Sequence, residues 1–144
     1  MMNSYFKRAK ELSDYSCDPN TKVGCIIVKD DVILSEGYNT LPKGLVNENY
    51  PLDCRLGPFL DTKYPYMIHS EAKAIVDAHR DLSGASMYVT LFPCNECAKL
   101  IIQAGIKEIC YLEDKYFDQD NVIASKKMLK EANVKLTHIE WKEI

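Results

Sequence analysis

The sequence has no excess of basic residues: its 144 residues include 18 Lys and Arg against 21 Asp and Glu, for a formal net charge of −3. A protein that wraps a nucleic acid needs a basic face, so this balance argues against that class. It leaves room for a small nucleotide, which needs only a few local cations. No apolar run is long enough to cross a membrane, and residues 1–7 lack the apolar stretch of a signal peptide. We therefore expect a cytoplasmic protein, with the nucleus as the alternative, and no membrane partner.

Repeats, low-complexity stretches and linkers rich in Gly, Ser or Pro are also missing, so the length indicates one domain over residues 1–144. In a reducing compartment the six cysteines should be metal ligands or buried apolar residues, not disulfides. Cys25 and Cys110 lie inside apolar runs and are expected in the core. Cys17 and Cys54 lie in loop-like sequence, where each is either a surface thiol or the ligand of a second metal.

The spacing of apolar residues predicts an alternation of helices and strands. Helices are expected over residues 5–15, 70–80, 95–104 and 121–132, and strands over residues 23–29, 32–36, 86–92, 106–112 and 134–139. The first two strands should form a hairpin that turns at Asp30 and Asp31. The later alternation predicts a three-layer α/β fold, with parallel strand pairs where helices make the crossovers. Residues 40–67 form a long segment leading into His69, which predicts an active-site loop.

The candidate site consists of His69 and Glu71, followed by Cys94 and Cys97, in the pattern H-x-E then P-C-x-x-C. One imidazole and two thiolates could hold a zinc ion and would leave its fourth position open, which a catalytic site needs. The two cysteines are one helical turn apart, so both can bind the same ion. The pattern resembles the signature of the zinc-dependent nucleobase deaminases.

Both halves of this pattern lie where a helix is expected to start. The partial positive charge at a helix N-terminus favours thiolate over thiol and stabilises an anionic intermediate. Zinc lowers the pKa of its bound water to about 7. A carboxylate beside that water, here Glu71, could take its proton and pass it to a ring nitrogen and then to the leaving amine.

Other uses of these residues fit the sequence less well. A structural zinc site usually has four protein ligands. His79 lies ten residues farther along the same predicted helix, about 15 Å from His69, and His138 lies in a predicted strand of alternating polarity. A redox C-x-x-C motif would leave the H-x-E pattern unexplained, and a non-enzymatic zinc module would have no use for Glu71.

Beyond this pattern, the chain resembles the deoxycytidylate (dCMP) deaminases of the cytidine deaminase-like superfamily over nearly its whole length. The residues that carry the resemblance are 18–24, 37–39, 61–66, 69–71, 87–99, 101–107 and 114–116. It implies a five-stranded mixed sheet flanked by helices, and hydrolytic deamination of dCMP to dUMP for thymidylate synthesis. It also implies a homo-oligomer, a hexamer in this family. One catalytic Zn²⁺ per subunit would be held by His69, Cys94 and Cys97, with Glu71 as the proton shuttle.

The resemblance extends to the substrate contacts. Asn39 would hold the sugar hydroxyl, Tyr116 would lie near the base, and Lys22 could meet the phosphate as a point charge. Each has an alternative role: a turn residue for Asn39, core packing for Tyr116 and a solvated surface lysine for Lys22. The full set of expected substrate-binding residues is Asn20, Lys22, Asn39, Tyr66, Ser70, Lys73, Pro93 and Tyr116.

Two stretches depart from the family's pattern. Ser70 and Lys73 stand where the family usually has Ala and Asn. Ser70 is small and suits a helix start. Lys73 could attract further phosphates, so that dCTP is accepted with an accompanying Mg²⁺, or it could form a surface ion pair with Asp77.

The second departure is Thr40, where the family commonly has Gly. The segment of Gly37, Tyr38 and Thr40 is the candidate effector region, because the family binds dCTP and dTTP there. Thr does not easily take a positive φ angle, which puts this regulation in question.

Three functions compete. The first is a dCMP deaminase, and the second is a relative that acts also or instead on dCTP. The third is a polynucleotide cytosine or adenine deaminase, which needs a channel of cations and aromatic residues. The tyrosines of residues 40–67 could supply stacking, but the acidic balance disfavours a stable nucleic acid partner. The expected partner is a small deoxycytidine nucleotide.

Overall fold

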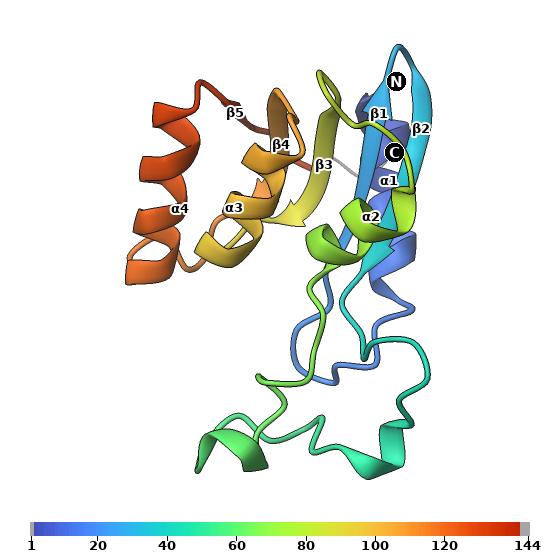
Figure 1. Ribbon diagram of the computed structural model, residues 1–144, viewed down its shortest axis with the longest axis vertical. Helices are drawn as coiled ribbons and strands as arrows, with labels where there is room; N and C mark the ends of the chain where they lie inside the picture. Colours follow the sequence, from blue (N-terminus) through green and yellow to red (C-terminus); the bar gives the residue numbers. More distant parts are fainter. Residues whose placement is uncertain (1, 142–144) are drawn as a thin grey trace.

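The five strands of the protein form a single mixed sheet in the order β2-β1-β3-β4-β5 (Figure 1). The computed structural model describes residues 2–141. Strand β1 pairs antiparallel with β2 and β3, whereas β3 with β4 and β4 with β5 are parallel. The predicted five-stranded mixed sheet is therefore confirmed. Its elements in chain order are α1 (Met2–Ser13), β1 (Gly24–Lys29), β2 (Val32–Tyr38), α2 (Ser70–Ala78), β3 (Ser86–Leu91), α3 (Asn95–Gln103), β4 (Glu108–Glu113), α4 (Asp120–Glu131) and β5 (Lys135–His138).

Local sequence explains where several of these elements turn or end. Asp30 and Asp31 both have positive φ, 52° and 63°, as a tight two-residue hairpin turn requires. The helix expected over residues 70–80 ends at Ala78, because His79 takes a left-handed conformation with φ 49° and ψ 37°. The first helix spans residues 2–13 where residues 5–15 were expected, and the second strand continues to Tyr38.

Helices cover both faces of the sheet, so its central strands are buried on both sides. Side chains of β1 alternate: Cys25 and Ile27 join the core under α2, α3 and α4, while Ile26 and Val28 pack against α1. Gly24 to Val28 are all buried, which explains a continuous apolar run in place of an alternating one. Cys110 is buried beside Phe6, so the core positions expected for Cys25 and Cys110 are confirmed.

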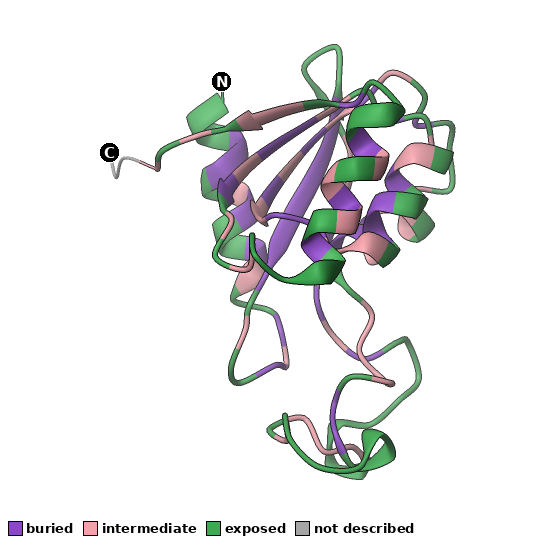
Figure 2. Cartoon of the chain, turned by 90° about the vertical axis from the view of Figure 1, so that its left-hand side faces the viewer, coloured by how far each residue is buried: buried purple, intermediate pink, exposed green. Residues whose placement is uncertain are grey.

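The segment over residues 40–67 projects beyond one end of the sheet (Figures 1 and 2). It contains two short 3₁₀ turns, η1 (Asn47–Asn49) and η2 (Phe59–Asp61), and its residues are mostly exposed. Its two ends are joined by a bridge between Thr40 and Ile68, with N–O distances of 3.1 and 2.8 Å. Thr40 is therefore extended at this position. Within the described residues, no helix is long and apolar enough to cross a membrane.

Gly37 allows α2 to lie directly on β2. A Cβ at this position would be 2.2 Å from the carbonyl oxygen of Ser70 and 2.8 Å from the amide nitrogen of Ala74. Gly24 has the same role on the other face, where a Cβ would be 1.9 Å from the carbonyl oxygen of Ala9 in α1. Both glycines are therefore required by close packing.

We predict that Gly37→Ala destabilises the protein by about 1–3 kcal/mol, as overpacking usually does, and also weakens zinc binding. The reason is that the new methyl pushes α2 off the sheet, and His69 immediately precedes α2. Urea unfolding and zinc titration would measure the two effects. Gly24→Ala is the matched control, since it displaces α1 and should lower stability without changing zinc affinity. Equal zinc affinities for both variants would contradict this role of Gly37.

Candidate active site

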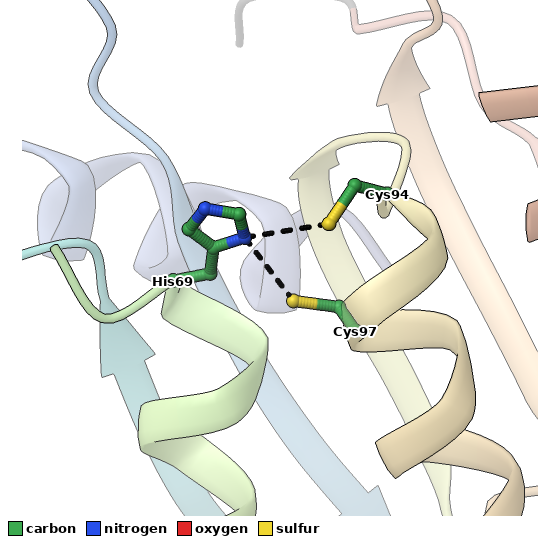
Figure 3. Close-up of side chains that lie close together, drawn as sticks. All are labelled: His69, Cys94 and Cys97. Carbon is green, nitrogen blue, oxygen red and sulfur yellow. Dashed lines mark hydrogen bonds between the residues drawn. The ribbon is translucent and has the colours of Figure 1, made fainter. Parts of the chain in front are cut away.

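The donor atoms of His69, Cys94 and Cys97 lie close together where α2 and α3 begin (Figure 3). The Nδ1 atom of His69 is 3.5 Å from the Sγ of Cys94 and 3.4 Å from the Sγ of Cys97. A tetrahedral zinc ion with usual bond lengths would place a nitrogen and a sulfur ligand about 3.6 Å apart. The three donors therefore fit a zinc ion, with the fourth position left for water or substrate.

Helix starts orient these side chains. His69 and Cys94 are the N-cap residues of α2 and α3, and neither side chain makes a capping hydrogen bond. Their donor atoms are thus free to bind a metal. Both helix N-termini also direct partial positive charge at the site, which stabilises thiolate.

Without a bound metal, the side chains of His69, Cys94 and Cys97 share protons through hydrogen bonds. The hydrogen bond with Cys97 lowers the pKa of Cys94 to about 4 and raises the pKa of the Cys97 thiol well above its usual value. The hydrogen bond with Cys94 raises the pKa of His69 to about 9. Zinc binding at neutral pH should therefore release protons from this set.

Glu71 lies in the first turn of α2 and is only 5% exposed. Burial raises the pKa of its carboxyl above the usual value, although His69 and the hydroxyl of Ser70 oppose this. The fully buried Ser70 donates a hydrogen bond from Oγ to Oε1 of Glu71. A buried carboxyl with a raised pKa beside a metal site is a candidate for proton transfer.

These groups open into a pocket of about 350 Å³, within the range of roughly 300–1,000 Å³ found for small-molecule sites. It is lined by the segment before β1, the end of β2 with the projecting loop, the end of β3, the starts of α2 and α3, and the connection from β4 into α4. The starts of α2 and α3, which help to line this pocket, lie at the end of the sheet from which the loop projects (Figure 1). Metal donors, a buried carboxylate and a nucleotide-sized space thus occur together.

Comparison with known families agrees with this geometry. The profile described as the cytidine and deoxycytidylate deaminase zinc-binding region matches residues 2–113. The chain belongs to this family. Membership identifies His69, Cys94 and Cys97 as its zinc-binding set.

Individual members of the family are similar over most of the chain. The deoxycytidylate deaminase of Homo sapiens is 47% identical over 133 residues, which cover 90% of this chain and 75% of that protein. A probable deoxycytidylate deaminase of Drosophila melanogaster is 41% identical over 150 residues, covering 98% and 74%. Among solved structures, the dCMP deaminase of cyanophage S-TIM5 in complex with dCMP and dUMP has a TM-score of 0.76 at 28% identity, covering 94% of each chain.

Three of the expected substrate-binding residues line this pocket: Asn39, Ser70 and Tyr116. Asn39 is buried, and its side chain accepts a hydrogen bond from the Val23 amide and donates one to the Thr21 carbonyl, each 2.8 Å long. It therefore joins β2 to the segment before β1 as well as facing the pocket. Tyr116 both lines the pocket and packs on the core, so its position is compatible with both expected roles.

Five other expected residues do not line this pocket: Asn20, Lys22, Tyr66, Lys73 and Pro93. The ammonium of Lys22 donates to the Ser16 carbonyl at 2.8 Å, and the hydroxyl of Tyr66 donates to the Leu60 carbonyl at 2.8 Å. Lys73 forms the ion pair with Asp77 at 2.7 Å and lies over the ring of Tyr38. The surface ion pair considered for Lys73 is thus present. The backbone amide of Asn20 bonds to Asp18, and the carbonyl of the buried Pro93 accepts from Ser125.

A second metal finds no support in the part of the chain that the structure describes. Cys17 accepts a hydrogen bond from Thr40, and the thiol of Cys54 donates to the Leu56 carbonyl. Among residues 2–141, His69, Cys94 and Cys97 are the one group of His, Cys, Asp and Glu side chains close enough to share an ion. The Mg²⁺ expected with a triphosphate is likewise unsupported by these residues.

Sequence reasoning missed a buried ion pair between Asp18 and Lys63, both of which line the pocket. Their charged atoms are 2.6 Å apart, and each side chain is 5% exposed. Asp18 also accepts hydrogen bonds from the amides of Asn20 and Thr21. Burial raises the pKa of Asp18, but the hydrogen bonds from Lys63 and the two amides outweigh it, so the pKa is lowered. Because 45 residues separate the partners, no local pattern could reveal the pair.

We predict that Lys63→Met destabilises the protein by about 3–5 kcal/mol at neutral pH, because it leaves the Asp18 carboxylate buried and uncompensated. A carboxyl whose folded-state pKa is lowered adds stability above its unfolded pKa of about 3.9 and loses it as the pH falls further. Without Lys63, burial raises that pKa, so the cost of the substitution should shrink toward pH 4.

Urea unfolding at pH 7 and pH 4 would measure this dependence. Lys99→Met is the control, because it breaks an exposed pair with Glu96 and should change stability by less than about 1 kcal/mol at either pH. If Lys63→Met lowers the free energy of unfolding as little as Lys99→Met does, the buried pair does not stabilise the fold as predicted.

Proposed function

We propose that this protein hydrolyses dCMP to dUMP and ammonia with a bound zinc ion, and so supplies dUMP for thymidylate synthesis. The observation that carries the proposal is the buried carboxylate of Glu71 beside the zinc-binding set, inside a pocket of nucleotide size. Similarity to the curated deoxycytidylate deaminases and to a dCMP deaminase solved with dCMP and dUMP supports this substrate.

The reaction replaces the amine on C4 of cytosine by oxygen from water. When bound, zinc supplies a Lewis acid that lowers the pKa of water to about 7. The Glu71 carboxylate accepts a proton from the attacking water, transfers it to N3 of the ring and then helps protonate the leaving amine, which departs as ammonia. The hydrogen bond from Ser70 to Oε1 orients the Glu71 carboxylate for this transfer.

The substrate contacts belong to the same proposal. Asn39 meets the sugar and Tyr116 the base, since both face the pocket. Lys73 is held by Asp77 outside this pocket, which gives no support to a preference for dCTP. Effector binding by dCTP and dTTP near Gly37, and assembly as a hexamer, remain proposals that rest on the resemblance to the family. A cytoplasmic location is proposed from the sequence itself, and the six free cysteines favour it.

The direct test of substrate is loss of cytosine absorbance when purified protein is mixed with dCMP, dCTP, deoxycytidine or a single-stranded oligonucleotide. We expect dCMP to have the highest kcat/KM of the four. A higher kcat/KM for dCTP than for dCMP would show that the triphosphate is the preferred substrate. Activity on the oligonucleotide alone would overturn the proposal.

We predict that Glu71→Gln lowers kcat on dCMP by about 10²–10⁴-fold, the usual contribution of a proton-transfer group. Zinc content should be unchanged, because Glu71 is not one of the three donors. Cys97→Ser is the comparison, as it should lose zinc and activity together. If Glu71→Gln loses zinc in parallel with activity, Glu71 is a ligand and the proposed role is wrong.

A further inference from the structure

Two side chains that line the pocket from the projecting loop carry permanent positive charge, Arg55 and Lys63. Both come from the segment over residues 40–67, whereas the zinc set comes from the helix starts. A nucleotide that offers its base to the zinc must also place its phosphate somewhere. The positively charged side chains that line the pocket are therefore the candidates to bind that phosphate.

Lys63 is already neutralised. Its ammonium lies 2.6 Å from the carboxylate of Asp18, and both side chains are almost fully buried. Breaking this pair to bind a phosphate would expose Asp18 as an unpaired buried charge. Lys63 is thus a poor free cation for a ligand.

The lysines singled out from the sequence are also unavailable at the pocket. Lys22 donates to the Ser16 carbonyl, and Lys73 pairs with Asp77; neither lines the cavity. Each would have to leave its present partner and reorient to reach a nucleotide.

Arg55 differs from all of these. It lines the pocket and is exposed, and it makes no ion pair or hydrogen bond with any residue that the structure describes. A guanidinium can bind two oxygens of a phosphate at once, and it stays charged at every relevant pH.

We propose that Arg55 binds the 5′-phosphate of the substrate and makes the site selective for a nucleotide over the corresponding nucleoside. The inference rests on the proposed function for the base end of the pocket, and it adds a specificity-determining residue on the loop. Arg55 takes no part in proton transfer, so its removal should change KM and leave kcat nearly unaltered.

The test uses full-length, zinc-loaded protein. Arg55→Ala should raise KM for dCMP by about 10- to 30-fold, the effect of losing hydrogen bonds to a charged group near the protein surface. KM for deoxycytidine should stay within about twofold, since no phosphate contact is lost. Arg55→Lys should recover part of the loss, because it keeps the charge without the planar fork. Raising the ionic strength should weaken dCMP binding less in Arg55→Ala than in the unchanged protein.

Arg80→Ala is the matched control, because Arg80 is also exposed and lies outside the pocket. It should leave both KM values unchanged. If Arg55→Ala leaves KM for dCMP unchanged, or raises KM for dCMP and deoxycytidine equally, Arg55 does not read the phosphate.

Calorimetric binding of dCMP in a Glu71→Gln background separates this inference from the proposed function. Weaker dCMP binding on adding Arg55→Ala, with deoxycytidine binding unchanged, supports the phosphate contact even if the unchanged enzyme fails to deaminate dCMP. If the unchanged enzyme deaminates dCMP but Arg55→Ala does not weaken dCMP binding, this inference alone is overturned. Failure of the protein to bind dCMP at all overturns both.

Discussion

The zinc site depends on where α2 and α3 begin relative to each other. His69 immediately precedes α2 and Cys94 immediately precedes α3, so their donor atoms meet only because both helices start at the same end of the sheet. Close packing maintains that arrangement: Gly37 lets α2 lie on β2, and the fully buried Ala98 and Ile101 hold α3 in the core. The geometry of the metal donors is thus a consequence of how two helices pack on a sheet. A distortion of that packing reaches the metal without altering any ligand.

Two buried carboxyl groups at this pocket, Asp18 and Glu71, have pKa values shifted in opposite directions by their surroundings. Asp18 has a buried lysine and two backbone amides as partners, so its pKa is lowered and it stays ionised as part of the framework. Glu71 is equally buried, but a neighbouring hydroxyl and His69 do not offset its desolvation, so its pKa is raised. A carboxyl that stays charged holds two segments together, whereas a raised pKa suits a carboxyl to the proton transfer proposed for Glu71. The structural role of Asp18 and the catalytic role proposed for Glu71 thus follow from different surroundings of the same chemical group.

Local sequence signals were enough to predict the strands and the hairpin turn at Asp30 and Asp31, because each depends on short-range spacing. The zinc-binding triad spans 28 residues and was predicted because its residues form a recognisable signature. Local signals failed where distant residues meet. The pair of Asp18 and Lys63 spans 45 residues, and the partners of Lys22 and Lys73 show why charge alone is a poor guide to phosphate contacts. The end of α2 was also missed by two residues, because His79 takes a left-handed conformation more usual for Gly or Asn. The positive φ angle considered for Thr40 is not required, because its backbone is extended and bridges to Ile68.

The pocket assigns its two tasks to different parts of the chain. The zinc donors and Glu71, the proposed proton-transfer group, must be placed accurately, and they lie at helix starts on the packed sheet. The charge proposed to recognise phosphate lies on an exposed loop, joined to the body by the bridge of Thr40 with Ile68 and the buried pair of Lys63 with Asp18. The loop should therefore tolerate substitutions better than the helix starts, since a phosphate contact accepts variation in distance that proton transfer does not. Substitutions in the loop can therefore alter which phosphate-bearing nucleotide is accepted, while the metal and the carboxylate keep their positions.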